Sequence, residues 1–373
     1  MELTQNFVDP AYAQVLEIFK NIKADEKGSQ LVVKVKGKTV IDLAAGVGPD
    51  SLTTVFSVSK ALSGIAIAKL VGEGRLNLDE RMAHYWPEFA AHNKGELTVR
   101  QVLSHQAGLI ATDPQLTIEM VHHDHAAAEA LAAQKPLWKP LSAFGYHGLT
   151  IGPLMSELVY RITGLTIQKY YDQDVRTPAN ADAYLGLPES LEKRVTPLSM
   201  EAVITYPGDE AKYARPAGFH NSGIAEWGNG NLPLDALIGR QGRAFGLASA
   251  EGVASARGLA DVMQWALGFG GGKPGVAASV IDDMSQMQVY GYDLALDQDH
   301  RSFGTVFQKP TQAIPFGSYK AIGHDGAAGS ILYADPEGEI VFAYTVARFA
   351  FPGGVDRAIQ PIIDLVRKVA TAR

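Results

Sequence analysis

Apolar residues along the chain follow two different patterns. Residues 11–23 and 357–370 carry them at helical spacing, which predicts amphipathic helices. Residues 61–73 are apolar on nearly every side, which is typical of a buried helix. Strand-like runs occur near both ends of the chain, at 31–35, 40–43, 303–307, 318–322, 330–334 and 340–346. We therefore expect an antiparallel sheet that the two ends of the chain build together.

The middle of the chain has a different pattern of predicted elements, because helical stretches alternate there with loops rich in Pro and Gly. Helices are predicted at 98–104, 117–133, 150–163 and 166–172. The stretch 205–248 is irregular, and we expect a long loop that covers or lines a cleft. The expected fold class is α+β. A discontinuous sheet domain of residues 1–75 and 255–373, with terminal helices on the sheet, would carry a mainly helical insertion of residues 76–254.

Composition narrows the possible functions. The chain has 373 residues and a net charge of −7, with 33 Lys and Arg against 40 Asp and Glu. Because phosphate binding needs clustered cations and no basic run is present, nucleic acid is not expected as the main partner. The absence of cysteine excludes disulfides, thiolate metal sites and a cysteine nucleophile. Without a secretion signal or a long apolar run, the expected location is cytoplasmic, with no membrane association.

Candidate chemistry begins at Ser57-Val58-Ser59-Lys60, which fits the pattern S-x-x-K. In a helix, residues three apart share a face, so Lys60 can lie beside the Ser57 hydroxyl. Burial lowers the pKa of a lysine, which can then accept the serine proton. The pattern alone is weak, since Ser190-Leu191-Glu192-Lys193 also fits it. That second match lies in a charged segment and is interpreted as solvated surface.

Further motifs follow Ser57 in a fixed order. They are Leu76-Asn77-Leu78-Asp79-Glu80, Tyr85-Trp86-Pro87-Glu88-Phe89, Leu103-Ser104-His105-Gln106-Ala107-Gly108, Phe144-Gly145-Tyr146-His147-Gly148 and Gly323-His324-Asp325-Gly326-Ala327-Ala328-Gly329-Ser330. This succession resembles the superfamily of serine β-lactamases and penicillin-binding proteins. More narrowly it resembles the family VIII carboxylesterases, the esterase branch related to class C β-lactamases. The resemblance covers most of the chain and implies a β-lactamase/transpeptidase-like fold.

The resemblance also implies a role for each matching residue. Ser57 would be the nucleophile that forms an acyl-enzyme, and Lys60 with Tyr146 would relay its proton. Backbone N–H groups of Ser57 and Ala327 would form the oxyanion hole. Candidate substrate-binding residues are His324, Gly326 and, as an aromatic wall of an acyl pocket, Trp227. No cofactor and no metal are implied, and the expected partner is a small-molecule ester.

Two departures from the β-lactamase pattern favour an esterase. Gly148 stands where β-lactamases usually have Asn, and His324 where they usually have Lys. Losing both polar anchors should weaken binding of anionic β-lactams and favour neutral acyl substrates. The predicted function is therefore hydrolysis of short-chain carboxylic esters. An acyltransferase or amidase using the same acyl-enzyme, or a weak β-lactamase, is the alternative.

Two alternatives from other classes stay open at this point. A non-catalytic binding protein could keep the fold, although intact Ser57, Lys60 and Tyr146 argue against it. A metal-dependent hydrolase could use His122-His123-Asp124-His125, but this cluster reads better as a solvated helix face. His105 is interpreted as structural, bonding loop backbone beneath the site.

Overall fold

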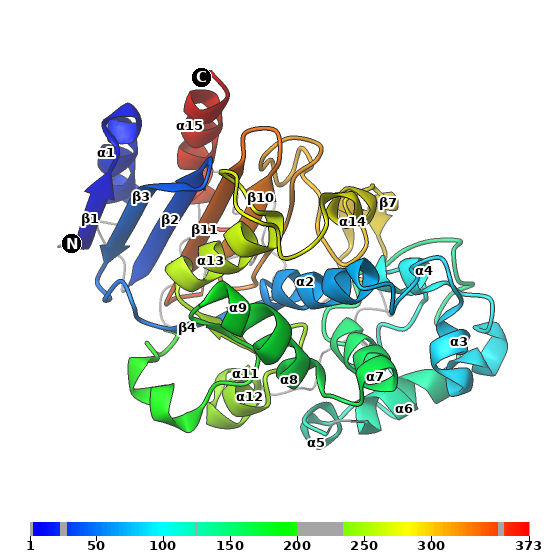
Figure 1. Cartoon of the computed structure of the whole chain (residues 1–373). Coiled ribbons are helices and arrows are strands. Elements are labelled where there is room, and N and C mark those ends of the chain that lie inside the picture. Colours follow the sequence, from blue (N-terminus) through cyan, green and yellow to red (C-terminus); the bar gives the residue numbers. More distant parts are fainter. Residues whose placement is uncertain (1–2, 23–27, 124, 200–233, 350–353, 373) are drawn as a thin grey trace.

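The centre of the fold is a six-stranded antiparallel sheet (Figure 1). The computed structural model describes residues 3–22, 28–123, 125–199, 234–349 and 354–372. Across the sheet the strands follow the order β1 (Leu3–Val8), β3 (Lys38–Ala45), β2 (Ser29–Val35), β11 (Ile340–Val346), β10 (Ile331–Asp335) and β9 (Ile322–Asp325). The two ends of the chain meet where β2 pairs with β11, with Ser29 opposite Val346. The predicted sheet is thus confirmed.

Helices cover both faces of this sheet (Figure 1). One face carries the two helices nearest the chain ends, α1 (Ala13–Ile22) and α15 (Gln360–Thr371). The other face carries α2 (Ser59–Gly72) and α13 (Ala256–Leu267). The remaining helices are α3 (Met82–Tyr85), α4 (Val99–Leu103), α5 (Ile118–Val121), α6 (Ala126–Ala133), α7 (Ile151–Thr163), α8 (Ile167–Tyr171), α9 (Thr177–Ala179), α11 (Leu234–Ile238), α12 (Arg240–Phe245) and α14 (Ala278–Met284). Short 3₁₀ or π segments span Pro10–Tyr12, Pro87–Asn93, Asp172–Arg176, Glu189–Arg194 and Arg357–Ile359.

Burial on both faces explains why the inner strands are apolar at successive positions. In β2, Leu31 and Val33 belong to the core under α1 and α15, whereas Val32 belongs to the core around α2. The turn from β2 to β3 contains Lys36 and Gly37, both at positive φ (48° and 76°). Such two-residue turns match the twist of the strands that they join.

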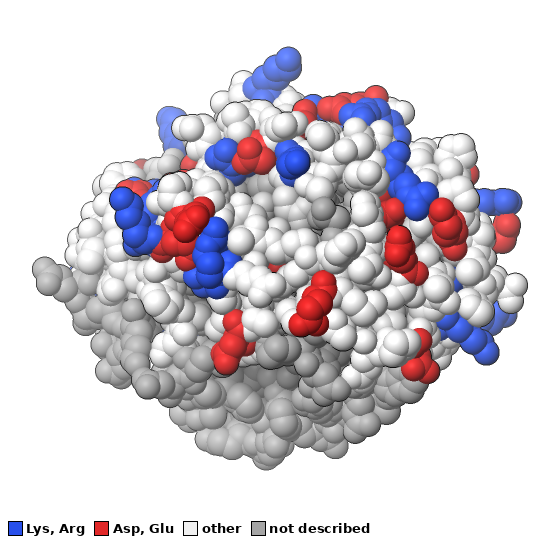
Figure 2. Space-filling model, turned by 90° about the horizontal axis from the view of Figure 1, so that it is seen from below, with Lys and Arg blue, Asp and Glu red and all other residues white. Residues whose placement is uncertain are grey.

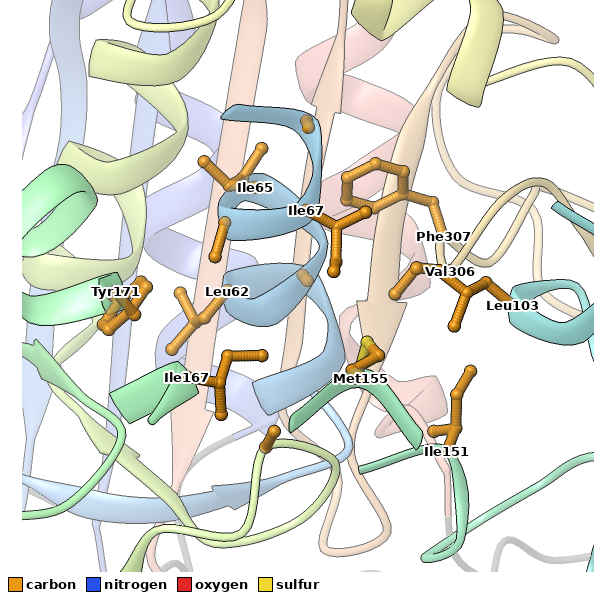
Figure 3. Close-up of a cluster of buried hydrophobic side chains, with 14 of the residues drawn as sticks. Leu62, Ile65, Ile67, Leu103, Ile151, Met155, Ile167, Tyr171, Val306 and Phe307 are labelled. Carbon is orange, nitrogen blue, oxygen red and sulfur yellow. The ribbon is translucent and has the colours of Figure 1, made fainter. Parts of the chain in front are cut away.

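Helix α2 is buried on every side, as its sequence predicts (Figure 3). Every residue from Ser59 to Ala68 is buried. In Figure 3 the side chains of Ile167 and Tyr171 lie on one side of the helix, and those of Leu103, Val306 and Phe307 lie on the other. A helix enclosed in this way holds its first turn rigidly, and that turn contains Lys60.

Two smaller sheets complete the described part of the chain. One contains β4 (Thr53–Phe56), β6 (Gly252–Ala254) and β5 (Ala183–Tyr184), with β6 in the middle. The other is a hairpin of β7 (Val289–Asp293) and β8 (Gln298–Phe303). Strand β4 leads directly into α2, so the first of these sheets fixes where that helix begins.

Two predicted strands are wrong in part. Strand β8 ends at Phe303, and residues 304–307 turn under α2. A Cβ on Gly64 would lie 2.8 Å from the Phe307 ring, so this apolar run reflects burial rather than strand pairing. Strand β9 begins only at Ile322, because residues 318–321 form a turn whose Ser318 N–H donates to the Asp335 carboxylate (2.7 Å).

Two predictions for the middle of the chain also need correction. The single helix expected at 117–133 is two helices, α5 and α6, interrupted between His122 and His125. The long loop expected at 205–248 contains α11 and α12 in its described part, and residues 205–233 lie outside the described residues. The large sheet uses strands only from 3–45 and 322–346, whereas the division of the chain at residues 75 and 254 stays a prediction.

The surface carries charges of both signs. Figure 2 shows Lys and Arg interspersed with Asp and Glu over the described part of one face, with uncharged surface between them. Among the described helices, none is long and apolar enough to cross a membrane. The cytoplasmic location stays a prediction.

Candidate active site

Ser57 lies at a sharp turn between β4 and α2. Phe56, the last residue of β4, has a φ of 47°, a left-handed conformation that bulky residues rarely adopt. The Phe349 ring contacts the Phe56 ring edge-on, with 5.7 Å between centroids, and the Ser59 hydroxyl donates to the Phe56 carbonyl. Strain of this kind persists where surrounding contacts fix it, and it is frequent at functional sites. The turn leaves Ser57 half-buried directly before the helix.

Lys60 is fully buried one turn after Ser57. Its Nζ lies 3.2 Å from Ser57 Oγ, 2.7 Å from the Gly148 carbonyl oxygen and 2.8 Å from the Ser249 carbonyl oxygen. Burial holds the pKa of Lys60 well below its ordinary value, against a smaller opposing effect of Asp325. A neutral amine has two N–H groups and one lone pair. Because the two carbonyls accept both N–H groups, the lone pair is left for the Ser57 hydroxyl.

Tyr146 reaches the same hydroxyl from the loop before α7. Its Oη lies 2.8 Å from Ser57 Oγ, and Lys60 Nζ lies 4.8 Å from the centroid of its ring. Burial raises the pKa of Tyr146 above its ordinary value. The phenol therefore keeps its proton at neutral pH, donates to Ser57 Oγ and leaves the serine proton directed at Lys60. The Lys60 amine and the Tyr146 phenol thus meet at one oxygen atom, Ser57 Oγ.

His105 holds the loop that carries Tyr146. Its carbonyl accepts the Gly145 N–H (3.1 Å), and its Nδ1 accepts the His147 N–H (3.1 Å). His147 Nε2 in turn accepts the Leu109 N–H (3.0 Å), so its Nδ1 carries the proton and donates to the Gly145 carbonyl (2.6 Å). Burial lowers the pKa of both histidines and keeps them neutral, as these acceptor roles require. The structural role predicted for His105 is confirmed by these contacts.

The predicted oxyanion hole lies where β9 ends beside β4. Neither the Ser57 N–H nor the Ala327 N–H donates a hydrogen bond to another described residue. Gly326 brings the two segments together, because a Cβ at this position would lie only 2.3 Å from the Val55 carbonyl oxygen. Two unpaired N–H groups near the nucleophile are what a tetrahedral oxyanion needs. Their joint role stays a prediction.

This close approach makes Gly326→Ala informative. We expect kcat for p-nitrophenyl butyrate to fall about 10²-fold, because a displaced turn carries the Ala327 N–H away from the oxyanion. Gly72→Ala is the control, since a Cβ there would lie 3.9 Å from its nearest neighbour. A folded Gly326→Ala protein that turns over as fast as Gly72→Ala would contradict the assignment.

Among the described residues, the structure gives no hydrogen bond between the candidate substrate-binding residues and Ser57. His324 is 1% exposed, its Nδ1 donates to the Asp325 carbonyl (2.7 Å), and its ring lies 5.8 Å from the Tyr146 ring. Burial lowers its pKa and keeps it neutral. Gly326 is buried in the turn, and Trp227 lies outside the described residues. Contact of these residues with substrate stays a prediction.

The interpretation of the histidine cluster as a solvated helix face is wrong for His122. Its side chain is only 4% exposed, and its Nε2 lies 2.6 Å from Glu251 Oε1. His125 likewise bonds Glu157 (2.7 Å), whereas Asp124 lies outside the described residues. Helix α5 ends directly before His122, whose side chain is turned inward. Within the part of the chain that the structure describes, His, Asp and Glu side chains form no group of three that could hold a metal.

Two functional groups at the site are main-chain carbonyls that sequence patterns did not indicate. The Gly148 and Ser249 carbonyls both accept from Lys60. The segment before β6 is fixed in turn, because the Ser63 hydroxyl donates to the Ala248 carbonyl (2.6 Å) and the Ser249 hydroxyl to the Leu149 carbonyl (2.7 Å). Every residue type has a main-chain carbonyl, so the sequence cannot indicate which carbonyls contact Lys60. Only the fold reveals these partners.

Such a site, at the start of a buried helix and beside the edge of an antiparallel sheet, is typical of serine-dependent acyl-transfer enzymes. A family model described as beta-lactamase matches residues 15–366. The chain therefore belongs to the β-lactamase family.

Individual relatives agree with this assignment. The esterase/beta-lactamase LipL of Mycobacterium tuberculosis is 30% identical over 372 residues, covering 92% of this chain and 83% of LipL. The structure of EstA from Arthrobacter nitroguajacolicus Rue61a is 38% identical, with a TM-score of 0.86 over 100% of this chain and 99% of EstA. A penicillin-binding protein homologue from Caulobacter crescentus is 30% identical, with a TM-score of 0.87 over 99% of this chain and 100% of that one.

A family VIII carboxylesterase structure shares the fold, with a TM-score of 0.86 at 24% identity over 99% of this chain and 100% of that one. Together the comparisons confirm the predicted family and fold. They identify the chain as a hydrolase of the esterase and β-lactamase type.

Proposed function

We propose that this enzyme hydrolyses short-chain carboxylic esters through an acyl-enzyme on Ser57. One observation carries the proposal: Ser57 Oγ lies 3.2 Å from a buried lysine amine and 2.8 Å from a buried phenol. An unactivated serine is a weak nucleophile, and an adjacent base is the usual means of activating it. LipL, described as an esterase/beta-lactamase, supports the same chemistry.

Acylation follows from the protonation states of the three groups. The Lys60 amine takes the Ser57 proton as Oγ attacks the ester carbonyl, and the N–H groups of Ser57 and Ala327 stabilise the oxyanion. When the tetrahedral intermediate collapses, Tyr146 gives its proton to the departing alkoxide. The Lys60 ammonium then returns a proton to Tyr146. Both groups end this step as they began it, and the alcohol leaves neutral.

Deacylation repeats these steps with water in place of serine. Water attacks the acyl carbon, the Lys60 amine takes its proton, and Ser57 Oγ leaves and recovers a proton from Tyr146. The free carboxylic acid departs, and proton return from Lys60 to Tyr146 restores the resting site. An alcohol or amine replacing water would give acyl transfer by the same steps.

Neutral substrates fit the polar groups around the nucleophile best. Burial keeps His324 uncharged, and Gly148 offers only a carbonyl, which Lys60 already occupies. Burial also lowers the pKa of Lys60, which favours its neutral amine form. A β-lactam carboxylate would thus meet none of these groups as a cation, which favours an ester over an anionic β-lactam.

The substrate class is tested by comparing p-nitrophenyl acetate and butyrate with a chromogenic cephalosporin. We expect kcat/KM to be about 10- to 150-fold higher for the esters, because a lost charge-assisted contact costs roughly 1.5–3 kcal/mol. Faster cephalosporin turnover would favour the β-lactamase alternative. No turnover of either class would leave a specialised acyltransferase or a binding protein.

The pH profile tests the base. The Lys60 amine must be unprotonated to act, so kcat/KM should rise with pH through the pKa of Lys60 and be lost below it. Burial lowers this pKa, which places the ascending limb well below the ordinary lysine range. Tyr146 must stay protonated, and burial raises its pKa, so activity should persist into alkaline solution. An ascending limb near the ordinary lysine value, in protein that circular dichroism shows to be folded, would contradict the assignment.

A further inference from the structure

We propose that Asp293, on the β7–β8 hairpin, is a positioning residue that fixes Tyr146 for proton transfer. The inference rests on the proposed role of Tyr146 as the proton donor to the leaving group. Tyr146 belongs to the loop before α7, so no helix or strand holds its backbone. Asp293 lies 147 residues further along the chain and comes to it from a separate element.

One carboxylate oxygen makes the connection. Asp293 Oδ1 accepts the N–H of Tyr146 (3.0 Å) and the N–H groups of Ala295 (2.9 Å) and Leu296 (3.0 Å). The last two belong to the turn of the hairpin itself. Asp293 therefore folds its own turn and joins that turn to Tyr146 through the same atom. The Leu294 N–H adds a parallel link to the Phe144 carbonyl (3.1 Å).

The same hairpin also holds the Tyr146 ring. Phe303 on β8 stacks on it, with 5.6 Å between centroids and 12° between planes. The Arg301 guanidinium lies 5.4 Å from the centroid of the Phe303 ring. Strand pairing places Gly291 opposite Arg301, so Arg301 and Phe303 lie on one face of the hairpin. The register shifts between Gly291 and Asp293, and Asp293 is buried toward Tyr146 beyond that shift. The hairpin therefore contacts both the backbone of Tyr146, through Asp293, and its ring, through Phe303.

Removing the Asp293 carboxylate would leave the Tyr146 N–H without its hydrogen-bond acceptor. Three successive N–H groups, those of Gly145, Tyr146 and His147, all donate to groups outside the loop. His105 accepts the first and the third, and Asp293 accepts the second. A buried N–H without an acceptor is costly, so the loop would shift to find one. A shift of the loop moves the phenol away from Ser57.

The position needs an acceptor rather than a charge. All three bonds use Oδ1, whereas Oδ2 has no hydrogen-bond partner in the described part of the chain. An amide oxygen can replace Oδ1 in all three bonds. Asp293→Asn should therefore preserve the geometry that Asp293→Ala destroys. This pair of variants separates positioning by hydrogen bonds from an effect of charge.

The test uses two esters with the same acyl group. In p-nitrophenyl butyrate the leaving group departs as an anion, whereas ethyl butyrate must release an alkoxide that needs a proton from Tyr146. We expect Asp293→Ala to lower kcat/KM for ethyl butyrate about 10- to 100-fold, since misplacing a reacting group by about 1 Å has effects of this order. The decrease for p-nitrophenyl butyrate should be several-fold smaller, and Asp293→Asn should stay within about threefold of wild type.

A double-mutant cycle with Tyr146→Phe separates positioning from general damage. If Asp293 acts through Tyr146, Asp293→Ala should change kcat/KM less than about threefold in the Tyr146→Phe background. Asp299→Ala, at an exposed position of the same hairpin, is the matched control and should be neutral. If Asp293→Ala does not fold, Asp293→Ser, whose shorter side chain keeps one oxygen acceptor but withdraws it from the Tyr146 N–H, takes its place in the same cycle.

The outcomes distinguish the proposed positioning role of Asp293 from the proposed proton-donor role of Tyr146. Equal losses for both esters, or full additivity with Tyr146→Phe, would overturn the positioning role of Asp293. An Asp293→Ala protein as active as Asp299→Ala would overturn it as well. If Tyr146→Phe itself keeps wild-type turnover of ethyl butyrate, the proposed proton donor is wrong. In that case the failure lies in the proposed function rather than in Asp293.

Discussion

Ser57→Ala is expected to lower kcat for p-nitrophenyl butyrate by about 10⁴-fold or more, because loss of the nucleophile removes the acyl-enzyme route. The replacement removes only Oγ, which lies 3.2 Å from Lys60 Nζ and 2.8 Å from Tyr146 Oη. Unfolding stability should change little, since Ser57 is half-buried at the start of α2. The measurement is turnover together with covalent labelling by a serine-directed phosphonate.

Ser190→Ala is the matched control for this experiment. Ser190-Leu191-Glu192-Lys193 fits the same four-residue pattern, but Ser190 and Lys193 are exposed on a short 3₁₀ segment. Only Ser57→Ala should abolish labelling. Full labelling of Ser57→Ala would contradict the assignment of Ser57 as the nucleophile. Activity that is lost to a chelator and insensitive to the substitution would favour the metal-dependent alternative.

Lys60→Ala and Tyr146→Phe are each expected to lower kcat by about 10²-fold or more, the usual scale for general acid and base groups. Their dependence on the leaving group should differ. In the proposed mechanism Lys60 activates Ser57 whatever group departs, so its loss should affect p-nitrophenyl and ethyl butyrate alike. Tyr146 protonates the leaving group in the same mechanism, so its loss should affect ethyl butyrate more. Steady-state kinetics with both esters measure this difference.

Lys94 provides the control for removing a buried lysine. Its Nζ donates to the carbonyls of Ala91, Ala132 and Gln134, and its side chain is as buried as that of Lys60. Lys94→Met should lower the free energy of unfolding and leave kcat unchanged. If Lys94→Met and Lys60→Ala lose turnover equally, the loss reflects stability, and Lys60 is not the base.

The sequence predicted the elements whose pattern reflects burial alone. Helix α2 is apolar on nearly every side because it is enclosed, and β11 is apolar at every position except Thr345 because both faces of the sheet are covered. The motifs around Ser57, Tyr146 and His324 could likewise be placed in order, since each one marks a turn next to a regular element. The structure brings the first two of these residues into hydrogen-bond contact.

Elements that depend on pairing partners could not be predicted in the same way. Strand β1 has the sequence Leu-Thr-Gln-Asn-Phe-Val, half of it polar, and pairs with the edge of β3. The β7–β8 hairpin was missed for a similar reason: exposed Tyr290 and Tyr292 alternate with a glycine, which weakens the apolar signal. Because the hairpin could not be predicted, the sequence did not distinguish Asp293 from a surface aspartate.

The carbonyls that hold Lys60 have a consequence for how this enzyme can change over evolution. Main-chain acceptors survive any side-chain replacement that keeps the backbone path, so the base is buffered against mutation at residues 148 and 249. Substrate range can therefore drift through other residues around the site while these contacts of Lys60 are inherited intact. Laboratory evolution of new acyl specificities has the same freedom, because libraries at these positions can vary side chains without removing the atoms that tune the nucleophile.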